Sequence, residues 1–550
     1  MTSVCAQRAG ANATLLSLLE QSLAQHRSQR ACVCMGRSLS YGQIDDLSQA
    51  LAAYLQGLGL ARGERVAVML PNVPQYLVTV AAVLRAGLVV VNVSPQLSAE
   101  DLEHQLRDSG AGAIVLIDSA AGTLAQVADK LPLRSTIVAT LGDLLGPLKG
   151  RIVNHWMHRV TAGRSRSALP DSLGFNQAVQ RGRRMILAPA AVGPEDIAVL
   201  QYTGGTTGTA RGVVLLHRNL VANLQQSLDW YGPALDRVPA RQQVVMVGAL
   251  PLHHIFAFTL VMLLGLRIGA CALLVPRPQD IASLIKQLSR QRFHCFPGID
   301  PLFRALALHV DAHRVDWSSL QLTLGGALAV GADTAELWQQ LTGSTICQGY
   351  GLTEAAPAVT CNPVTDTHFS GHVGLPLGHT ELALLDDEGR RVPVGQPGEI
   401  AIRGPQLMAG YWQRPDETAR AITADGFVRS GDIGVIDAKG HLRLLDRKKD
   451  LIFVSGFNVY PSEVEDIVVQ MPGIRSCAAV AMPDALAGEA VKLVLVRADD
   501  AATCPSEADV RAWCAQRLIS HKQPRQVEFR RELPLSAVGK VLRRGLRESV

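Results

Sequence analysis

Apolar residues follow two alternating patterns along the first two-thirds of the chain. Residues 44–55 show the spacing of one helix face, and Ser40 with Gln43 can form a capping box in front of it. The continuous apolar run 66–70 follows at once and indicates a buried strand. Such alternation predicts a mainly parallel α/β sheet covered by helices on both faces. Further helix–strand pairs are expected at 102–108 with 113–117 and at 281–292 with 294–296.

Two apolar runs are long enough to be tested as membrane spans. They cover residues 76–93, interrupted by Arg85, and residues 259–275, interrupted by Arg267. Each run is no longer than about 18 residues, and its central charge costs roughly 2.5–3.5 kcal/mol on insertion into a bilayer. We therefore expect both runs to form buried core.

The pattern changes after about residue 371. Short alternating runs separated by Gly and Pro turns, such as 381–385 and 399–403, predict a β-rich subdomain over about 371–445. The charged segment 446–450 then precedes about 100 residues of mixed pattern. We expect an N-terminal domain over 1–445, a hinge at 446–450 and a C-terminal domain over 451–550.

Composition excludes several classes of protein. At 550 residues, with 48% hydrophobic and 18% charged residues, the chain is too large for a small binding module and too apolar for a disordered protein. The net charge of +5 is too dilute for nucleic-acid binding, so no DNA or RNA partner is expected. No signal peptide is recognisable, and ten scattered cysteines without metal-ligand spacing suit a reduced, cytoplasmic protein.

One segment is rich in glycine and threonine and lies after an apolar run. It comprises Thr203, Gly204, Gly205, Thr206, Thr207, Gly208 and, after two more residues, Arg211. Glycines let the backbone approach an anion, threonine hydroxyls donate to phosphate oxygens, and a terminal cation balances their charge. The pattern indicates a phosphate-binding turn, with an ordinary hairpin as the alternative. It is neither a Walker A loop nor a dinucleotide fingerprint.

Three later segments carry compatible chemistry. Residues 348–354 combine an aromatic face with a hydroxyl and a carboxylate, the groups that adenine stacking and Mg²⁺ ligation require. Asp432 follows a tight turn at 429–431, where its carboxylate could accept from ribose hydroxyls. Lys540 stands at a loop-to-helix junction. Taken singly, Asp432 and Lys540 are more typical of ordinary solvated surface residues than of a binding site.

In this order, the four segments resemble the adenylate-forming superfamily of acyl-CoA synthetases, nonribosomal adenylation domains and luciferases. The resemblance covers nearly the whole chain. It is strongest to the bacterial long-chain fatty-acid:CoA ligases, because of residues 201–208, 250–257, 446–452 and 455–461. It implies a large N-terminal α/β domain of mainly parallel sheets with an embedded β-rich subdomain, and a small mobile α+β C-terminal domain.

The resemblance also implies a reaction. ATP and Mg²⁺ would activate a medium- to long-chain fatty acid as its acyl-adenylate with release of pyrophosphate, and CoA would then displace AMP. Both half-reactions depend on positioning and on charge neutralisation.

Site residues follow from the same resemblance. Phosphate binding is implied for Thr203, Gly204, Gly205, Thr206, Thr207 and Gly208, and Mg²⁺ binding for Thr206 and Glu354. The remaining nucleotide contacts are implied for Gly325, Gly326, Ala327, Gln348, Gly349, Tyr350, Gly351 and Thr353, with Asp432 and Arg447 on the ribose. Lys540 is implied as the adenylation catalyst, Lys449 as the hinge and Gly456 as the residue presented to the pantetheine tunnel.

His253 and His254 could suggest a metal site. Adjacent residues on an extended strand point to opposite faces, however, and no third ligand has suitable spacing. By resemblance, His254 lies beside the acyl carboxylate, and Phe258 stands at the acyl tunnel; a core histidine and a packed phenylalanine are the alternatives.

Two features depart from the simplest interpretation. The phosphate loop of the family usually ends Pro-Lys-Gly, whereas this chain has Ala210-Arg211-Gly212; arginine keeps the charge but has a larger, planar head.

The segment 149–166 is basic and has one apolar helical face, which is made up of Ile152, Val153, Trp156, Met157 and Val160. This helix would either pack on the large domain or lie as a peripheral contact on the inner face of an anionic membrane.

The sequence leaves alternatives open. An aryl or other carboxylic acid:CoA ligase, or an enzyme that loads a carrier protein, would share these motifs. A non-catalytic acyl-adenylate or fatty-acid binding protein is the alternative from another class. The preferred acid, the oligomeric state and the pathway are not specified by the sequence.

Overall fold

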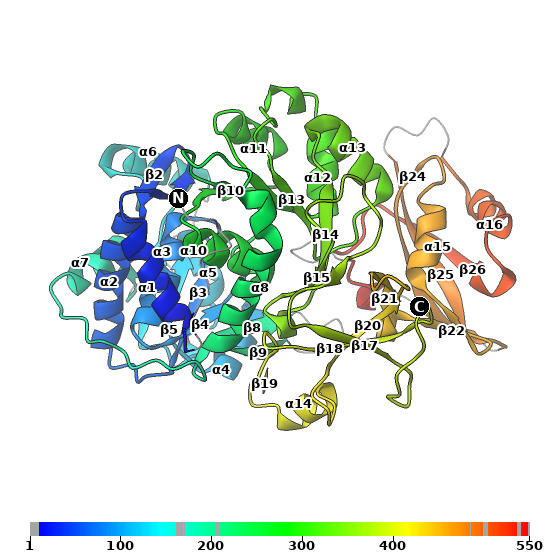
Figure 1. The fold of residues 1–550 in the computed structure, drawn as a ribbon, viewed down its shortest axis with the longest axis horizontal. Helices are drawn as coiled ribbons and strands as arrows, with labels where there is room; N and C mark the ends of the chain where they lie inside the picture. Colours follow the sequence, from blue (N-terminus) through cyan, green and yellow to red (C-terminus); the bar gives the residue numbers. More distant parts are fainter. Residues whose placement is uncertain are drawn as a thin grey trace. The chain divides into compact units, whose positions relative to one another are not determined.

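The chain divides into two compact units by its internal contacts. Of the described residues, the first unit comprises those up to 203 and those within 210–381 and 403–422, and the second comprises those within 382–402 and those from 423 onward. The computed structural model, drawn in Figure 1, describes residue 10 and residues 12–160, 169, 171–203, 210–484, 486–498, 504–535 and 541–547.

A nine-stranded sheet forms one half of the first unit. Its six central strands are parallel, and its two edges are antiparallel. In spatial order the strands are β16 (Leu375–Pro376), β15 (Ala358–Cys361), β14 (Ile346–Gly351), β13 (Leu322–Gly325), β12 (Cys295–Gly298), β10 (Val245–Gly248), β11 (Cys271–Leu274), β1 (Arg30–Cys34) and β2 (Arg37–Ser40).

An eight-stranded sheet forms the other half. Only the two strands at one edge are antiparallel to their neighbours. The spatial order is β19 (Gly410–Tyr411), β9 (Arg211–Leu216), β8 (Ile197–Thr203), β4 (Val89–Asn92), β3 (Arg65–Met69), β5 (Ala111–Ile117), β6 (Ser135–Ala139) and β7 (Leu173–Gly174). The predicted mainly parallel α/β fold is confirmed.

Helices connect most of these strands. In chain order they are α1 (Leu15–Gln25), α2 (Tyr41–Gly57), α3 (Pro74–Arg85), α4 (Ala99–Ser109), α5 (Ala121–Ala125), α6 (Pro147–Val160), α7 (Phe175–Gly182), α8 (His217–Leu235), α9 (Ile255–Ala257), α10 (Gly265–Arg267), α11 (Ile281–Leu288), α12 (Asp300–Ala307), α13 (Ala332–Thr342) and α14 (Pro415–Ala421). A π-helical stretch, Phe258–Leu264, joins α9 to α10. Figure 1 shows α12 and α13 beside the β13–β14 part of the nine-stranded sheet.

Local sequence signals account for α2. The Ser40 hydroxyl accepts from the Gln43 N–H, and the Gln43 side chain accepts from the Ser40 N–H, so the predicted capping box is present. The buried residues include Ile44, Leu51 and Leu55, as the helical spacing required.

Both long apolar runs are part of the core. Residues 76–93 divide between α3 and β4, and residues 259–275 divide among the π-helical stretch, α10 and β11. Their charged residues are buried with partners: Arg85 pairs with Asp45 at 2.5 Å, and Arg267 donates to Gln21 at 3.0 Å. No helix in the described part of the chain combines the length and hydropathy that a membrane crossing needs.

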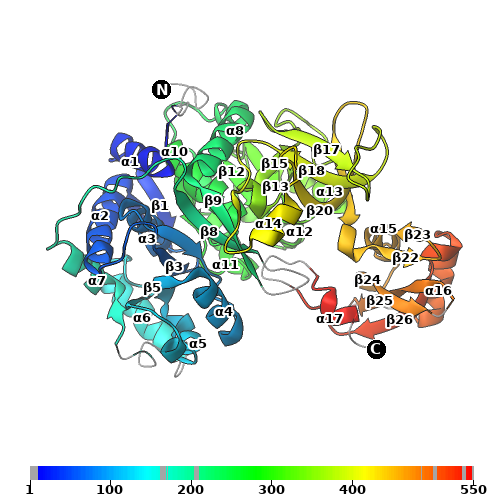
Figure 2. The same cartoon turned by 90° about the horizontal axis from the view of Figure 1, so that it is seen from below.

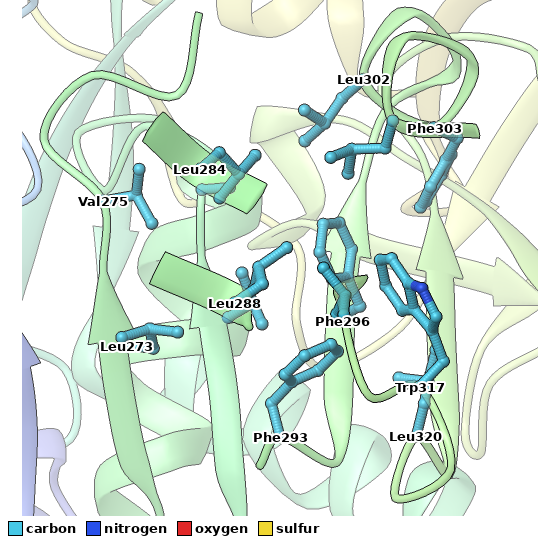
Figure 3. Packing of buried hydrophobic residues seen from close by; sticks show 14 of the residues in the cluster. Leu273, Val275, Leu284, Leu288, Phe293, Phe296, Leu302, Phe303, Trp317 and Leu320 are labelled. Atoms are coloured by element: carbon cyan, nitrogen blue, oxygen red, sulfur yellow. The ribbon is translucent and has the colours of Figure 1, made fainter. Parts of the chain in front are cut away.

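An aromatic core fixes the position of strand β12. Trp338 is fully buried, with its ring centroid 5.3 Å from Phe296, 4.8 Å from Phe303 and 5.2 Å from Trp317. Figure 3 shows Phe296 and Phe303 beside Trp317, with leucines of α11 and α12 on the same side. This packing holds β12 and α12 rigidly beside the carboxyl ends of β13 and β14.

The second unit contains two sheets. The strands β17 (Glu381–Leu385), β18 (Gly398–Arg403), β20 (Val428–Ile436) and β21 (Leu442–Arg447) form the first, and the 3₁₀ turn Lys448–Asp450 follows. The second sheet comprises β22 (Ile452–Val454), β23 (Phe457–Val459), β24 (Ile474–Asp484), β25 (Gly488–Arg497) and β26 (Pro524–Arg530). The predicted boundary at 446–450 remains a prediction.

Helices cover both faces of the five-stranded sheet. Ala479 and Leu493 pack with residues of α15 (Pro461–Val468) and α16 (Glu507–Ala515). Their neighbours Ala478 and Val494 face the other way, toward a cluster with Leu546 of α17 (Arg544–Arg547). Figure 2 shows α15, α16 and α17 around this sheet. The unit is therefore α+β, as expected.

Candidate active site

The carboxyl ends of β13 and β14 bring two predicted nucleotide segments together. Gly325, the last residue of β13, pairs with Gln348 of β14 in parallel register, so Gly326 and Ala327 leave the sheet beside Gly349–Gly351, the last residues of β14. The Gln348 side chain accepts from the Val330 N–H at 2.9 Å and fixes the turn after β13. Tyr350 is 8% exposed.

Glycine is required at Gly351. A Cβ atom at this position would lie 2.1 Å from the Pro357 carbonyl oxygen, which leaves no room for any side chain. Close approach of these two backbone segments brings the turn that carries Thr353 and Glu354 directly against the end of β14.

Glu354 is fixed by a residue far away in sequence. The Tyr411 hydroxyl donates to Glu354 Oε1 at 2.8 Å, and the Met408 N–H donates to the Glu354 carbonyl at 2.8 Å. Burial, together with the Glu354 carboxylate, raises the pKa of Tyr411 well above its ordinary value, so the hydroxyl remains protonated and donates.

The glycine- and threonine-rich segment is framed by an antiparallel hairpin. Thr203 at the end of β8 pairs with Arg211 at the start of β9. Gly204, Gly205, Thr206, Thr207 and Gly208 lie outside the described residues, so their predicted roles remain predictions.

Both ends of that hairpin are anchored to α4. The Tyr202 hydroxyl donates to Asp108 Oδ2 at 2.7 Å, and a ring nitrogen of His104 lies 3.0 Å from the Ala210 carbonyl oxygen. Trp412 donates through its indole N–H to the Asp108 carbonyl at 3.0 Å. These contacts fix the strands on either side of the predicted phosphate loop.

Arg211 contacts two residues of the 410–421 segment. Its Nη1 donates to Glu417 Oε2 at 2.5 Å, and its Cζ lies 4.7 Å from the centroid of the Tyr411 ring. Burial acts to lower the pKa of Arg211, yet the carboxylate of Glu417 and the other nearby acidic groups raise it overall. The guanidinium is therefore a fixed cation at the start of β9.

The histidine pair lies in a turn. His253 and His254 follow β10, and His254 is the N-cap of α9, where its Nδ1 accepts from the Phe256 N–H at 3.4 Å. The expectation of an extended strand was therefore wrong. Pro251, between two leucines, is the local signal for this turn that the sequence contains.

Buried amides, which the sequence analysis missed, hold this turn. Asn72 donates to the Gly248 and Leu250 carbonyls, both at 2.8 Å, and Gln201 donates to the His253 carbonyl at 3.0 Å. Asn92 bridges to Gln201 at 2.9 Å. A polar residue at the carboxyl end of an apolar strand, as at Asn92 and Gln201, was the signal available in the sequence.

The turn also lies at a topological switch point. The chain passes from β10 to β11 on one side and then returns to β12 on the other side of β10. Ligands of open parallel α/β sheets bind in the crevice outside the carboxyl ends of the strands at such a point. His253 and His254 follow β10 at this end.

Burial lowers the pKa of His253 to about 3, so its imidazole is neutral at neutral pH. Phe258 is fully buried.

The second unit carries a second set of predicted residues. Arg447 Nε lies 2.8 Å from Asp432 Oδ1, and the two residues are direct cross-strand neighbours on β20 and β21. Gly431 has a φ of +70° at an irregularity inside β20, so the predicted turn before Asp432 is a bulge within a strand.

Two of the remaining predicted residues of this unit lie in turns. Lys449 is in the 3₁₀ turn Lys448–Asp450, and Gly456 has a φ of +83° in the turn between β22 and β23. Lys540 lies outside the described residues, between Leu535 and Val541, which form a β-bridge.

The described residues supply only some of the oxygen ligands that a bound Mg²⁺ ion needs. No group of three or more histidine, cysteine, aspartate and glutamate side chains within those residues is arranged to hold a metal ion. Glu354 offers one half-buried carboxylate. Mg²⁺ typically takes one or two protein carboxylates and completes its shell with water and phosphate oxygens, so this donor fits Mg²⁺.

Comparison with known proteins identifies relatives along nearly the whole length. A family profile described as AMP-binding enzyme matches residues 19–412, and one described as AMP-binding enzyme C-terminal domain matches residues 463–540. The long-chain-fatty-acid–CoA ligase of Escherichia coli O6:H1 is 46% identical over 536 residues, which cover 97% of this chain and 94% of that protein.

More distant relatives agree with this match. The long-chain-fatty-acid–CoA ligase of Bacillus subtilis (strain 168) is 33% identical over 539 residues, covering 98% of this chain and 94% of that protein. Among solved structures, ATP-bound MatB from Rhodopseudomonas palustris superposes with a TM-score of 0.81 at 27% identity, covering 98% of this chain and 99% of that one.

Proposed function

This chain belongs to the family of AMP-binding enzymes, and from that premise we propose that it is an ATP-dependent long-chain fatty acid:CoA ligase. It converts a fatty acid, ATP and CoA into acyl-CoA, AMP and pyrophosphate. The observation that carries the proposal is the near-full-length similarity to long-chain-fatty-acid–CoA ligases, which runs through both matched domains.

The reaction proceeds in two displacements. A carboxylate oxygen of the fatty acid attacks the α-phosphorus of ATP, the bond to the bridging oxygen breaks, and pyrophosphate leaves. The sulfur of CoA, after losing its proton, attacks the acyl carbonyl carbon, and AMP leaves with the electrons of the mixed anhydride bond. Neither step needs a covalent bond to the protein, so the residues position the reactants and neutralise charge.

The first unit binds the nucleotide. Gly325–Ala327 and Tyr350 receive the adenine at the ends of β13 and β14. The 203–208 segment holds the phosphates, and Arg211 faces them from the start of β9. His254, at the switch point, contacts the substrate carboxylate. Support comes from the parallel register of β13 with β14 and from the amides that hold the 250–254 turn.

Glu354, together with Thr206, would hold Mg²⁺. When bound, the ion offsets the negative charge of the triphosphate. The chain's own contribution is the orientation of the Glu354 carboxylate, which the Tyr411 hydroxyl fixes.

The second unit binds the ribose and supplies the mobile groups. Asp432 accepts from the ribose hydroxyls, and Arg447, 2.8 Å away, orients that carboxylate. Lys540 neutralises the charge that develops on the α-phosphate and the substrate carboxylate. Rotation about Lys449 then withdraws Lys540 and presents Gly456 to the pantetheine arm of CoA.

A screen of substrates tests the proposal. Pyrophosphate release and acyl-CoA formation are measured with fatty acids of graded length and with aromatic acids, each with and without CoA. We expect turnover to be highest with long-chain acids and to require CoA for the thioester product. Preference for aromatic acids would favour an aryl acid:CoA ligase, adenylation without CoA turnover a carrier-loading enzyme, and silence with every acid a binding protein.

A membrane contact through α6 is a further part of the proposal. Leu148 and Ile152 lie one turn apart and are 74% and 62% exposed, and Arg151 and His155 are exposed on the same face. Asn154 faces the body of the unit, where it donates to Thr140 Oγ1 at 2.9 Å. The side chains of Trp156, Met157 and Val160 lie outside what the structure describes. An outward face of this composition suits the surface of an anionic bilayer.

Flotation with anionic liposomes tests this contact. We expect Ile152→Glu to reduce the co-floating fraction severalfold, because it places a carboxylate on the apolar face. Ile186→Glu changes an isoleucine elsewhere on the first unit that is more exposed than Ile152, at 94% against 62%, and is the control. Equal flotation of both variants and the wild type would show that α6 does not contact the membrane.

A further inference from the structure

One tyrosine contacts both the carboxylate and the arginine of the first unit's site. The Tyr411 hydroxyl donates to Glu354 at 2.8 Å, and the face of the same ring lies beneath the Arg211 guanidinium at 4.7 Å. Glu417, six residues after Tyr411, accepts from Arg211 at 2.5 Å. Neither Tyr411 nor Glu417 belongs to the motifs that identify the nucleotide site.

These two contacts suit arginine better than lysine. A guanidinium is planar, so it can lie flat on the Tyr411 ring while an N–H at its edge donates to Glu417. An ammonium is compact and strongly hydrated, and it would have to satisfy one contact at the expense of the other. The side chains of Arg211 and Glu417 are 34% and 28% exposed, so solvent screens this pair only in part.

Glu417 is in turn linked to both strands of the hairpin. Arg414 Nε lies 3.8 Å from Glu417 Oε1, and Arg414 Nη2 lies 2.7 Å from Asp108 Oδ1. Asp108 also accepts from Tyr202, at the end of β8. The ion pairs therefore connect the start of β9 to the end of β8, the two strands that hold the 204–209 segment between them.

We propose that Tyr411 and Glu417 are positioning residues for adenylation, and that Glu417 is the partner that makes arginine effective at position 211. The Tyr411 ring sets the separation between the phosphate-side cation Arg211 and the metal-side carboxylate Glu354. Glu417 fixes the guanidinium at the start of β9. This inference rests on the proposed function, because it assigns these residues to the ATP-dependent half-reaction.

Two consequences distinguish this arrangement from a purely structural one. Arg211 and Glu417 form a matched pair, so the effects of changing them are not additive. In addition, loss of the Tyr411 hydroxyl affects the carboxylate that holds Mg²⁺, whereas the ring that supports Arg211 stays in place. The thioester-forming half-reaction consumes no triphosphate and is spared.

A double-mutant cycle tests the pair. The variants E417Q, R211K and E417Q/R211K are compared with the wild type for the KM of ATP and for kcat in pyrophosphate release. We expect E417Q alone to raise the KM of ATP about tenfold, as the loss of a charge-assisted hydrogen bond does, and to have less than a threefold effect in the R211K background. E195Q, which neutralises a partner of Arg218 in an exposed ion pair of the same unit, is the matched control and is expected to behave as the wild type.

The variant Y411F tests the second contact. We expect it to raise the Mg²⁺ concentration needed for half-maximal pyrophosphate release about tenfold, and to leave acyl-CoA formation from supplied acyl-adenylate and CoA within about twofold. Thermal unfolding verifies that Y411F and E417Q are folded.

Several outcomes would overturn the inference. Additive effects of E417Q and R211K would show that Glu417 and Arg211 do not act together. An unchanged Mg²⁺ requirement in Y411F would show that the Tyr411 hydroxyl does not position the Glu354 carboxylate. Equal loss of both half-reactions would reduce the two residues to a structural role. If the wild type itself forms no acyl-CoA with any acid, the proposed function fails. That failure differs from a failure of this inference, because the double-mutant cycle is measured against an active wild type.

Discussion

The residues around the candidate site show how burial determines protonation. His217, the first residue of α8, is 2% exposed, and burial lowers its pKa to about 4, although Asp196 acts in the opposite direction. His253 is held neutral in the same way. Both imidazoles are therefore uncharged in the folded protein near neutral pH.

The lowered pKa of His217 predicts a pH dependence of stability. Below about pH 6.5 the unfolded chain protonates this histidine, whereas the folded protein does not do so until about pH 4. His217 therefore contributes its full stabilisation above pH 6.5 and loses it as the pH falls toward 4, by about 2 kcal/mol between pH 7 and 5.

Urea unfolding of the wild type and His217→Gln, at pH 7 and at pH 5, measures this contribution. We expect the free energy of unfolding to fall about 2 kcal/mol less in the variant over this interval. Parallel pH profiles of the two proteins would show that His217 does not contribute.

At the scale of helices and strands, features that depend on neighbouring residues could be predicted from the sequence, whereas features that depend on distant residues could not. The helix α2 and its capping box depend on neighbours three residues apart, so the sequence contains them. The helix expected over 281–292 ends at Leu288, and the sequence did not predict this end because no glycine or proline follows it directly. Glycine with a positive φ occurs both in tight turns and in β-bulges, so the sequence alone does not tell whether Gly431 forms a turn or a bulge.

The candidate site divides in the same way. Its motif residues could be predicted because each motif is contiguous. Glu417 was missed because it is 206 residues from its partner Arg211, and Tyr411 because it is 57 residues from Glu354. Only the fold, which pairs β19 with β9, brings them together.

The aromatic core behind β12 predicts a large loss of stability on truncation. Trp338 is fully buried among three aromatic rings, and its indole N–H donates to Thr323 Oγ1 at 3.2 Å. We expect Trp338→Ala to lower the free energy of unfolding by about 3–5 kcal/mol, because it leaves a large cavity among the aromatic rings. Trp338→Phe keeps most of the volume and should lose less. Equal urea midpoints for the two variants would contradict this packing.

A buried ion pair joins α15 to the residue that precedes α17 in the second unit. Arg543 donates to both carboxylate oxygens of Glu465 at 2.8 Å, and the Ala479 N–H donates to the same carboxylate. We expect Arg543→Ala to destabilise this unit by about 3–5 kcal/mol, because it leaves a buried carboxylate without its cation.

Amide hydrogen exchange of the full-length protein tests this pair. Exchange at Ala479 and along β24 should accelerate in Arg543→Ala, and should return toward the wild-type rate in the double variant Arg543→Met/Glu465→Leu, which removes both charges. An unchanged exchange rate in Arg543→Ala would show that the pair contributes nothing.

For the whole molecule, the proposed chemistry draws on both units. The first unit carries the nucleotide segments, Glu354, Arg211 and the histidine turn, whereas the second carries Asp432 and Arg447 and, beyond the described residues, Lys540. A lysine that serves only the adenylation step needs to reach the α-phosphate in one half-reaction and has no part in the other. This division of labour between half-reactions is the central claim.

The two half-reactions of Lys540→Ala, measured separately, test that claim most directly. Pyrophosphate release from ATP and a long-chain fatty acid should fall by at least about 100-fold, because a charge that stabilises the transition state is lost. Acyl-CoA formation from supplied acyl-adenylate and CoA should stay within about threefold of the wild type. Lys439→Ala, at an exposed turn of the same unit, should change neither rate. An equal fall of both half-reactions in Lys540→Ala would contradict the account.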